Sequence, residues 1–167
     1  TKYSMYFAPK LSPMLAKDYY SDEKAGELIP YQDYLTKLYV LLGLTEADAK
    51  TNMQQYLALE KTMAASMMEA QNYGNIELVY NPYTMDKLQA LFPSVNLTKL
   101  LESDGYQTER QYIVTDPAML EAFAGALENA SAAELQAYAR MSIISAFASC
   151  LSEDYIKASN EFSQQMY

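Results

Sequence analysis

The longest helical pattern in the chain begins at Thr45 and is predicted to run to Gln71. Its apolar side chains recur three and four residues apart, which places them on one face of an α-helix. Thr45 is suited to cap the helix, and Glu46 and Asp48 follow in the first turn, where the helix dipole favours acidic groups. The predicted apolar stripe consists of Ala49, Met53, Tyr56, Leu57, Met63, Ala64 and Met67. A helix of this length must bury that stripe against other elements.

Further helices are predicted on both sides of this one, over residues 31–42, 84–92, 96–102, 117–129, 131–151 and 152–167. Gly43 is suited to end the first of them, and Ser131 and Glu134 have the spacing of a capping box at the start of the helix over 131–151. Short extended pieces are predicted at 2–7, 76–80 and 112–114. The stretch from Met141 to Leu151 is apolar or small almost all the way round, so we expect it to be buried on most sides. The predicted fold class is mainly α, a multi-helical lobe with two or three short extended segments, in one domain over residues 1–167.

The composition excludes several classes of protein. About half of the 167 residues are apolar, which is enough for one ordinary domain with a buried core. A net charge of -9 and a pI near 4.4 argue against the basic surface that nucleic acids require. No run of about 18 apolar residues occurs, so we expect no membrane span.

Histidine is absent from the chain and cysteine occurs once. Without histidine the chain cannot form an H-E-x-x-H zinc site or a Ser-His-Asp triad. Cys150 cannot close an intramolecular disulfide, and its apolar surroundings in the sequence predict a small buried hydrophobe. Asp18, Asp22 and Glu23 could bind a hard cation weakly, but their spacing matches no EF-hand loop, and a solvated loop is expected.

Glu60 falls on the apolar stripe of the longest predicted helix. A buried carboxylate needs a partner, because removing its charge from water is costly. The chain has two arginines, and Arg140, early in an apolar helix, is the predicted partner of Glu60. A catalytic carboxylate, a structural ion pair and a helix cap all remain possible interpretations, with the structural ones favoured.

Two further features bear on what kind of molecule this is. The chain starts at Thr1 without a signal-peptide pattern, and its last predicted helix is still running at Tyr167, which suggests a piece cut from a larger protein. The sixteen tyrosines could line a groove for a peptide or sugar, or could fill the boundary between a helical core and water. Their spread along the chain favours the second interpretation.

The order of several short motifs resembles the N-terminal, non-catalytic region of the neprilysin-like zinc metallopeptidases, which include endothelin-converting enzymes and bacterial oligopeptidases. The motifs are Asp18-Tyr19-Tyr20, Leu59-Glu60, Tyr80-Asn81-Pro82-Tyr83-Thr84-Met85, Leu88-Gln89, Val114-Thr115-Asp116-Pro117 and Leu151-Ser152-Glu153-Asp154-Tyr155. The resemblance covers nearly the whole chain. Lys17 and Leu15 replace the family's arginine and proline, and Met141-Ser142 replaces a tryptophan-arginine pair, which suggests a divergent bacterial member.

The resemblance implies a helical lobe that faces a catalytic lobe of the same polypeptide and limits a central chamber to oligopeptides. The family's H-E-x-x-H motif, third glutamate ligand and asparagine-alanine motif lie C-terminal to this region. No cofactor is therefore expected in these residues, zinc is expected in the parent enzyme, and this piece alone is expected to be inactive. A bacterial cell surface or secreted location is favoured over the cytoplasm. The alternatives are an independent helical module that binds a peptide or protein, and a small enzyme built around Glu60.

Overall fold

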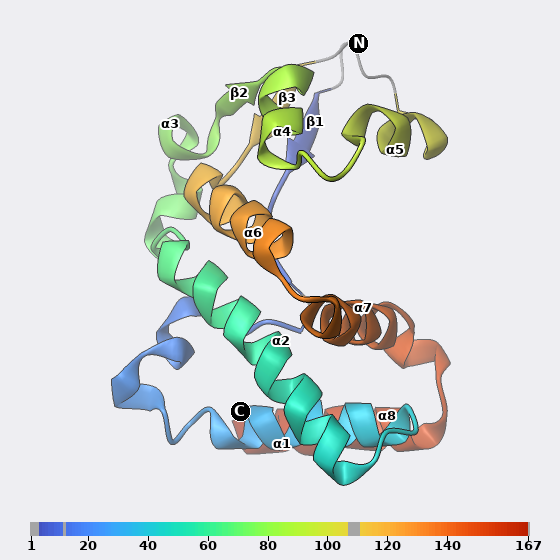
Figure 1. Cartoon of the computed structure of the whole chain (residues 1–167). Coiled ribbons are helices and arrows are strands. Elements are labelled where there is room, and N and C mark those ends of the chain that lie inside the picture. Colours follow the sequence, from blue (N-terminus) through green and yellow to red (C-terminus); the bar gives the residue numbers. More distant parts are fainter. Residues whose placement is uncertain (1–3, 12, 107–110, 167) are drawn as a thin grey trace. The chain divides into compact units, whose positions relative to one another are not determined.

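The computed structural model describes residues 4–11, 13–106 and 111–166. Within these ranges the chain forms eight α-helices and one three-stranded sheet (Figure 1), which confirms the predicted mainly α class. The helices are α1 (Ile29–Leu41), α2 (Glu46–Ser66), α3 (Ile76–Val79), α4 (Met85–Leu91), α5 (Leu97–Ser103), α6 (Pro117–Asn129), α7 (Ala132–Phe147) and α8 (Glu153–Met166). The strands are β1 (Met5–Phe7), β2 (Asn81–Tyr83) and β3 (Tyr112–Val114), and short 3₁₀ turns occur at η1 (Lys17–Tyr20), η2 (Asp22–Lys24), η3 (Ala70–Gly74) and η4 (Ala148–Cys150).

The contacts divide the chain into two compact units, and each is described by itself. The first unit comprises residues 1–10 and 66–129, and the second comprises residues 11–65 and 130–167. Two contact units can belong to one domain, so the single domain predicted over residues 1–167 stays a prediction.

The first unit is built around the small sheet. Strand β3 lies in the centre, parallel to β1 and antiparallel to β2, with Ile113 opposite Tyr6 on one side and Pro82 on the other. All three residues of β3 are buried. Its side chains pack with those of β2, α4 and α6 in a core made of Tyr83, Leu88, Tyr112, Val114 and Leu120. The predicted strand at 112–114 is confirmed, whereas β2, which contains a proline at an edge position, was not predicted.

Asp116 joins three segments of the first unit. One carboxylate oxygen accepts the backbone N–H of Met119 at 3.1 Å and so caps α6. The other accepts the backbone N–H of Met68 and the hydroxyl of Tyr73, both at 2.8 Å. Asp116 is buried, so this side chain fixes the chain that follows α2 onto the start of α6.

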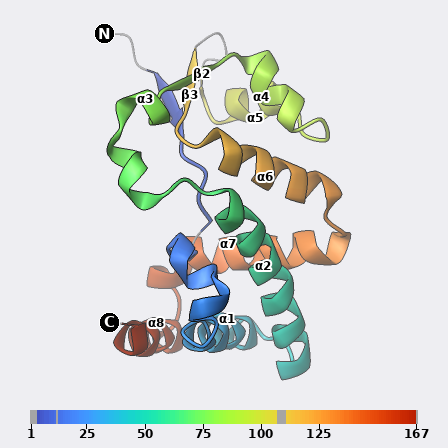
Figure 2. The same cartoon turned by 90° about the vertical axis from the view of Figure 1, so that its left-hand side faces the viewer.

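The second unit packs α1, α2, α7 and α8 together (Figure 2). Helices α1 and α8 lie side by side (Figure 2), and the ring of Tyr34 stacks on that of Phe162 with centroids 4.5 Å apart. The Tyr39 hydroxyl donates to the Ala137 carbonyl of α7 at 2.9 Å. Buried side chains come from all four helices: Tyr31, Leu35, Leu38 and Tyr39; Ala49, Met53, Tyr56, Leu57, Met63 and Ala64; Ala137, Met141 and Ile144; Tyr155 and Ala158.

Several predicted helix ends are confirmed at the level of single atoms. The Thr45 hydroxyl accepts the Asp48 N–H at the start of α2. Ser131 and Glu134 form a reciprocal capping box at the start of α7. Gly43 follows α1 with a φ of 100°, a conformation that glycine adopts without steric cost.

Two predicted elements are corrected by the structure. Residues 76–80 were expected to be extended, but α3 occupies Ile76–Val79, because the Asn75 side chain accepts the Glu77 N–H and caps a helical turn there. Helix α2 ends at Ser66 rather than Gln71. The Met68 N–H bonds to Asp116 instead of continuing the helical ladder, a contact with a residue far along the chain that no local pattern reveals.

The expectation that residues 141–151 are buried on most sides is also corrected. The inner face of α7 is buried at Met141 and Ile144, whereas Ile143 and Phe147 are 58% and 56% exposed. The described part of the second unit therefore has no element that covers the opposite face of α7.

Candidate functional site

Glu60 is fully buried on α2, as the sequence predicts. Its carboxylate accepts a hydrogen bond from the Tyr31 hydroxyl of α1 at 2.6 Å and one from the Tyr20 hydroxyl of η1 at 3.0 Å. The Tyr20 hydroxyl in turn accepts the backbone N–H of Leu15 at 3.0 Å. Tyr56, one helical turn before Glu60 on α2, also hydrogen-bonds to the carboxylate. This tyrosine cluster ties the segment before α1, α1 itself and α2 to a single carboxyl group.

Burial raises the pKa of Glu60 from its ordinary 4.5 to about 7, while the hydrogen bonds from Tyr31, Tyr20 and Tyr56 act in the opposite direction. Burial and the nearby charge of Glu60 raise the pKa of Tyr20 and of Tyr31 far above the ordinary range. The phenols therefore remain protonated donors at neutral pH and well above it. The carboxyl group is the member of the cluster that titrates near neutral pH.

Arg140 is not the partner that the sequence predicted for Glu60. Its guanidinium Nη1 donates to Asn52 Oδ1 at 2.8 Å, and the Asn52 amide donates to the Asp48 carbonyl at 2.9 Å. Asn52 precedes Glu60 by eight residues on α2, which is roughly 12 Å along a helix axis. A guanidinium held at Asn52 lies two turns from the carboxylate. The predicted Glu60–Arg140 ion pair is therefore not formed. Neutral phenols, rather than a cation, donate hydrogen bonds to the buried acid.

The partners of Glu60 decide what the cluster can do. A carboxylate that works as a catalytic acid or base must reach a substrate, and Glu60 has no exposed surface. The groups that bond to it are tyrosine hydroxyls rather than a second acid. This favours the structural interpretation of Glu60. Tyr56 was the partner that the sequence could have indicated, since residues four apart on a helix are neighbours.

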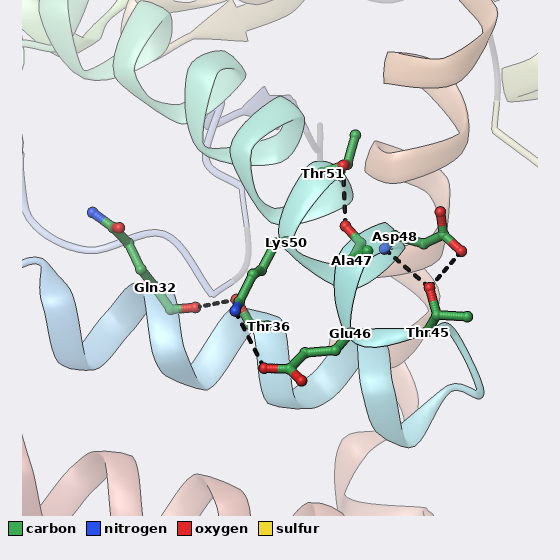
Figure 3. Close-up of polar contacts among 8 residues, drawn as sticks. All are labelled: Gln32, Thr36, Thr45, Glu46, Ala47, Asp48, Lys50 and Thr51. Carbon is green, nitrogen blue, oxygen red and sulfur yellow. Dashed lines mark hydrogen bonds and ion pairs between the residues drawn. The ribbon is translucent and has the colours of Figure 1, made fainter.

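A groove of about 580 Å³ lies between α1 and α2 in the same unit. Figure 3 shows part of its wall, with Gln32 and Thr36 on α1 and the ion pair between Glu46 and Lys50 on α2, whose charged atoms are 3.2 Å apart. The full lining is Gln32, Asp33, Thr36, Lys37, Val40, Glu46, Lys50, Met53 and Gln54. Amides and charges of both signs surround two apolar side chains, so the groove can hydrogen-bond a polypeptide but is not specialised for one ion.

The acidic and thiol groups singled out in the sequence do not come together. Asp18, Asp22 and Glu23 are exposed around the turns η1 and η2. Cys150 is exposed rather than buried, because it lies in the turn η4 after α7 instead of on the inner face of a helix. Among the described residues no three histidine, cysteine, aspartate or glutamate side chains are placed to hold a metal ion. The residues that the structure describes therefore do not fit a zinc site.

The family model for peptidase family M13, in its N-terminal part, matches residues 1–167. Endothelin-converting enzyme 1 of Mus musculus is 27% identical over 159 residues, in a match that covers 91% of this chain and 21% of that protein. Neprilysin-3 of Drosophila melanogaster is 31% identical over 110 residues, in a match that covers 64% of this chain and 14% of that protein. The chain thus matches at most about a fifth of the length of these curated relatives.

Solved structures share the same fold. The Mycobacterium tuberculosis zinc metalloprotease Zmp1 in its open state superposes with a TM-score of 0.84 at 21% identity, covering 95% of this chain and 25% of that chain. The same enzyme in complex with an inhibitor gives a TM-score of 0.83 at 20% identity. Of the helices described, none is both long enough and apolar enough to cross a membrane.

Proposed function

Because this chain belongs to peptidase family M13, in its N-terminal region, we propose that it forms the non-catalytic helical lobe of a neprilysin-like zinc endopeptidase. The observation that carries the proposal is the family match over residues 1–167, together with a shared fold across 95% of the chain in a zinc metalloprotease. The activity belongs to a longer polypeptide, because the chain spans about a fifth of its curated relatives.

The zinc of the parent enzyme would be held by residues outside this chain, since no histidine occurs here. When bound in a peptidase, zinc activates a water molecule and polarises the peptide carbonyl. Such chemistry benefits from a site that limits access of bulk water. The contribution of this chain is a wall of packed helices, which buried contacts such as those of Glu60 and Asp116 hold together.

We further propose that this wall helps to enclose the substrate chamber and restricts it to oligopeptides. The test is a pair of substrates that carry the same scissile bond, one a ten-residue fluorogenic peptide and the other an unfolded protein chain. The parent enzyme should cleave the peptide at least tenfold faster. Equal rates on the two substrates would contradict an enclosing lobe while leaving the family assignment intact.

A second candidate is an independent helical module that binds a peptide, which the groove between α1 and α2 favours. It predicts that the 167-residue chain alone binds peptides and that Lys50→Glu, which reverses a charge in the groove, weakens binding. The lobe proposal predicts that the isolated chain binds peptides no more tightly than its Lys50→Glu variant does.

A further inference from the structure

Helix α7 has two faces of different character. Toward the rest of its unit it buries Ala137, Met141 and Ile144. On the other side, Leu135, Ala139, Ile143 and Phe147 follow one another at intervals of four residues, and all four are exposed. We call these four residues the α7 ridge. Residues four apart form a continuous ridge on a helix surface, here roughly 18 Å long.

The α7 ridge is apolar where a free surface would be polar. Ile143 and Phe147 are each more than half exposed, and Leu135 is 40% exposed. The sequence from Met141 to Leu151 contains no charged residue, and Ala146, also exposed, lies beside the ridge. Contiguous exposed apolar surface of this kind marks an interaction site. Ala139 and Ala146 leave room between the large side chains for the backbone of another helix to approach.

The remaining length of the relatives indicates what covers the ridge. The Zmp1 structure superposes on 95% of this chain, yet the superposed part is only 25% of that chain. A protein of this family therefore has ample further polypeptide to cover α7. A second copy of this chain is a poor occupant, because each copy carries a net charge of -9 and like charges repel.

We propose that the α7 ridge is a docking face for an apolar helix from the part of the same polypeptide that lies outside these 167 residues. The proposal rests on the proposed function, since it needs the longer enzyme. The contact is intramolecular and dry, with Ile143 and Phe147 as the central side chains. The sequence predicts that this face of α7 is buried, and the docked helix supplies the cover that the described residues lack.

The test is thiol labelling of the purified full-length enzyme under native conditions. Ile143→Cys is made with Cys150→Ser, and the matched control is Thr51→Cys in the same background, at an exposed position on α2. Alkylation at each position is followed by mass spectrometry of the peptide that contains it. We expect position 143 to react at least tenfold more slowly than position 51. A second variant, Phe147→Cys, should be protected to the same degree.

Equal rates at positions 143 and 51 would overturn the proposal. Protection that disappears on dilution of the enzyme would also overturn it, because the occupant would then be a second copy. Chelator-sensitive peptide cleavage is measured on the same samples. Loss of protection with retained cleavage contradicts only the docking face, whereas protection without any cleavage supports the docking face and contradicts the proposed function.

Discussion

The Tyr31 hydroxyl donates a 2.6 Å hydrogen bond to the carboxylate of Glu60, and neither side chain has any exposed surface. The two residues are 29 positions apart and belong to different helices, α1 and α2. The bond therefore joins the two helices through a group whose charge depends on pH. The stability of the second unit should then change over the pH range in which Glu60 titrates.

The pH dependence can be predicted from the raised pKa of Glu60. Between pH 4.5 and about 7 the folded chain keeps the Glu60 proton, whereas the unfolded chain has lost it. The contribution of Glu60 to the free energy of unfolding should therefore be largest below pH 4.5 and should fall by about 3 kcal/mol as the pH rises to 7. Glu60→Gln should remove that part of the slope in urea denaturation curves measured from pH 4.5 to 8. An unchanged slope in the variant would contradict this account of Glu60.

Tyr31→Phe should destabilise the chain most where Glu60 is ionised. The variant removes a donor to a buried carboxylate, which costs about 1.5–3 kcal/mol when the acceptor is charged. Since the lost bond also favoured the ionised form, the pKa of Glu60 should rise further. Tyr6→Phe, at a largely exposed tyrosine, is the control and should leave the urea midpoint at pH 8 unchanged. Equal midpoints for the two variants would count against the cluster.

Asp116→Asn should lower the thermal midpoint of the first unit. An amide keeps one acceptor oxygen but presents an N–H₂ group to the other donors, so at least one of the bonds from Met68, Tyr73 and Met119 is lost in a buried site. We expect a cost of about 2–4 kcal/mol. Asp104→Asn, at an exposed position, is the matched control. Equal midpoints for the two variants in calorimetry would show that Asp116 does not hold these segments together.

Ser131→Ala should cost about 1 kcal/mol, because it removes half of the capping box at the start of α7. Ser131→Asp should restore most of the loss, since aspartate also caps helices well. Ser142→Ala is the control within the same helix, because the Ser142 hydroxyl donates to a carbonyl one turn earlier and caps no helix end. If Ser142→Ala is as costly as Ser131→Ala in urea denaturation, the capping box is not what stabilises the helix start.

The sequence predicts best what depends on neighbouring residues. The box of Ser131 and Glu134, the Thr45 cap and the glycine after α1 are all formed within a few residues, and the structure has each of them. The burial of Glu60 followed from helical periodicity alone. Motif order along the chain also indicated the peptidase family that the comparisons confirm.

Contacts between distant residues were beyond such reasoning. Tyr20 reaches Glu60 from 40 positions away, and Arg140 reaches Asn52 across 88, so the partner predicted for Glu60 was wrong. The predicted burial of Cys150 and Phe147 rested on the apolar composition of their segment. Composition predicts that a segment is covered, but not whether the covering element lies within these residues. The cell-surface or secreted location stays a prediction.

The measurement that tests the central claim most directly is peptide cleavage by the full-length enzyme and by the 167-residue chain, each with and without a zinc chelator. We predict that the full-length enzyme cleaves a fluorogenic oligopeptide, that the chelator abolishes the cleavage, and that the 167-residue chain is silent in both conditions. Chelator-insensitive cleavage by the 167-residue chain would contradict the claim and would return Glu60 to consideration as a catalytic residue.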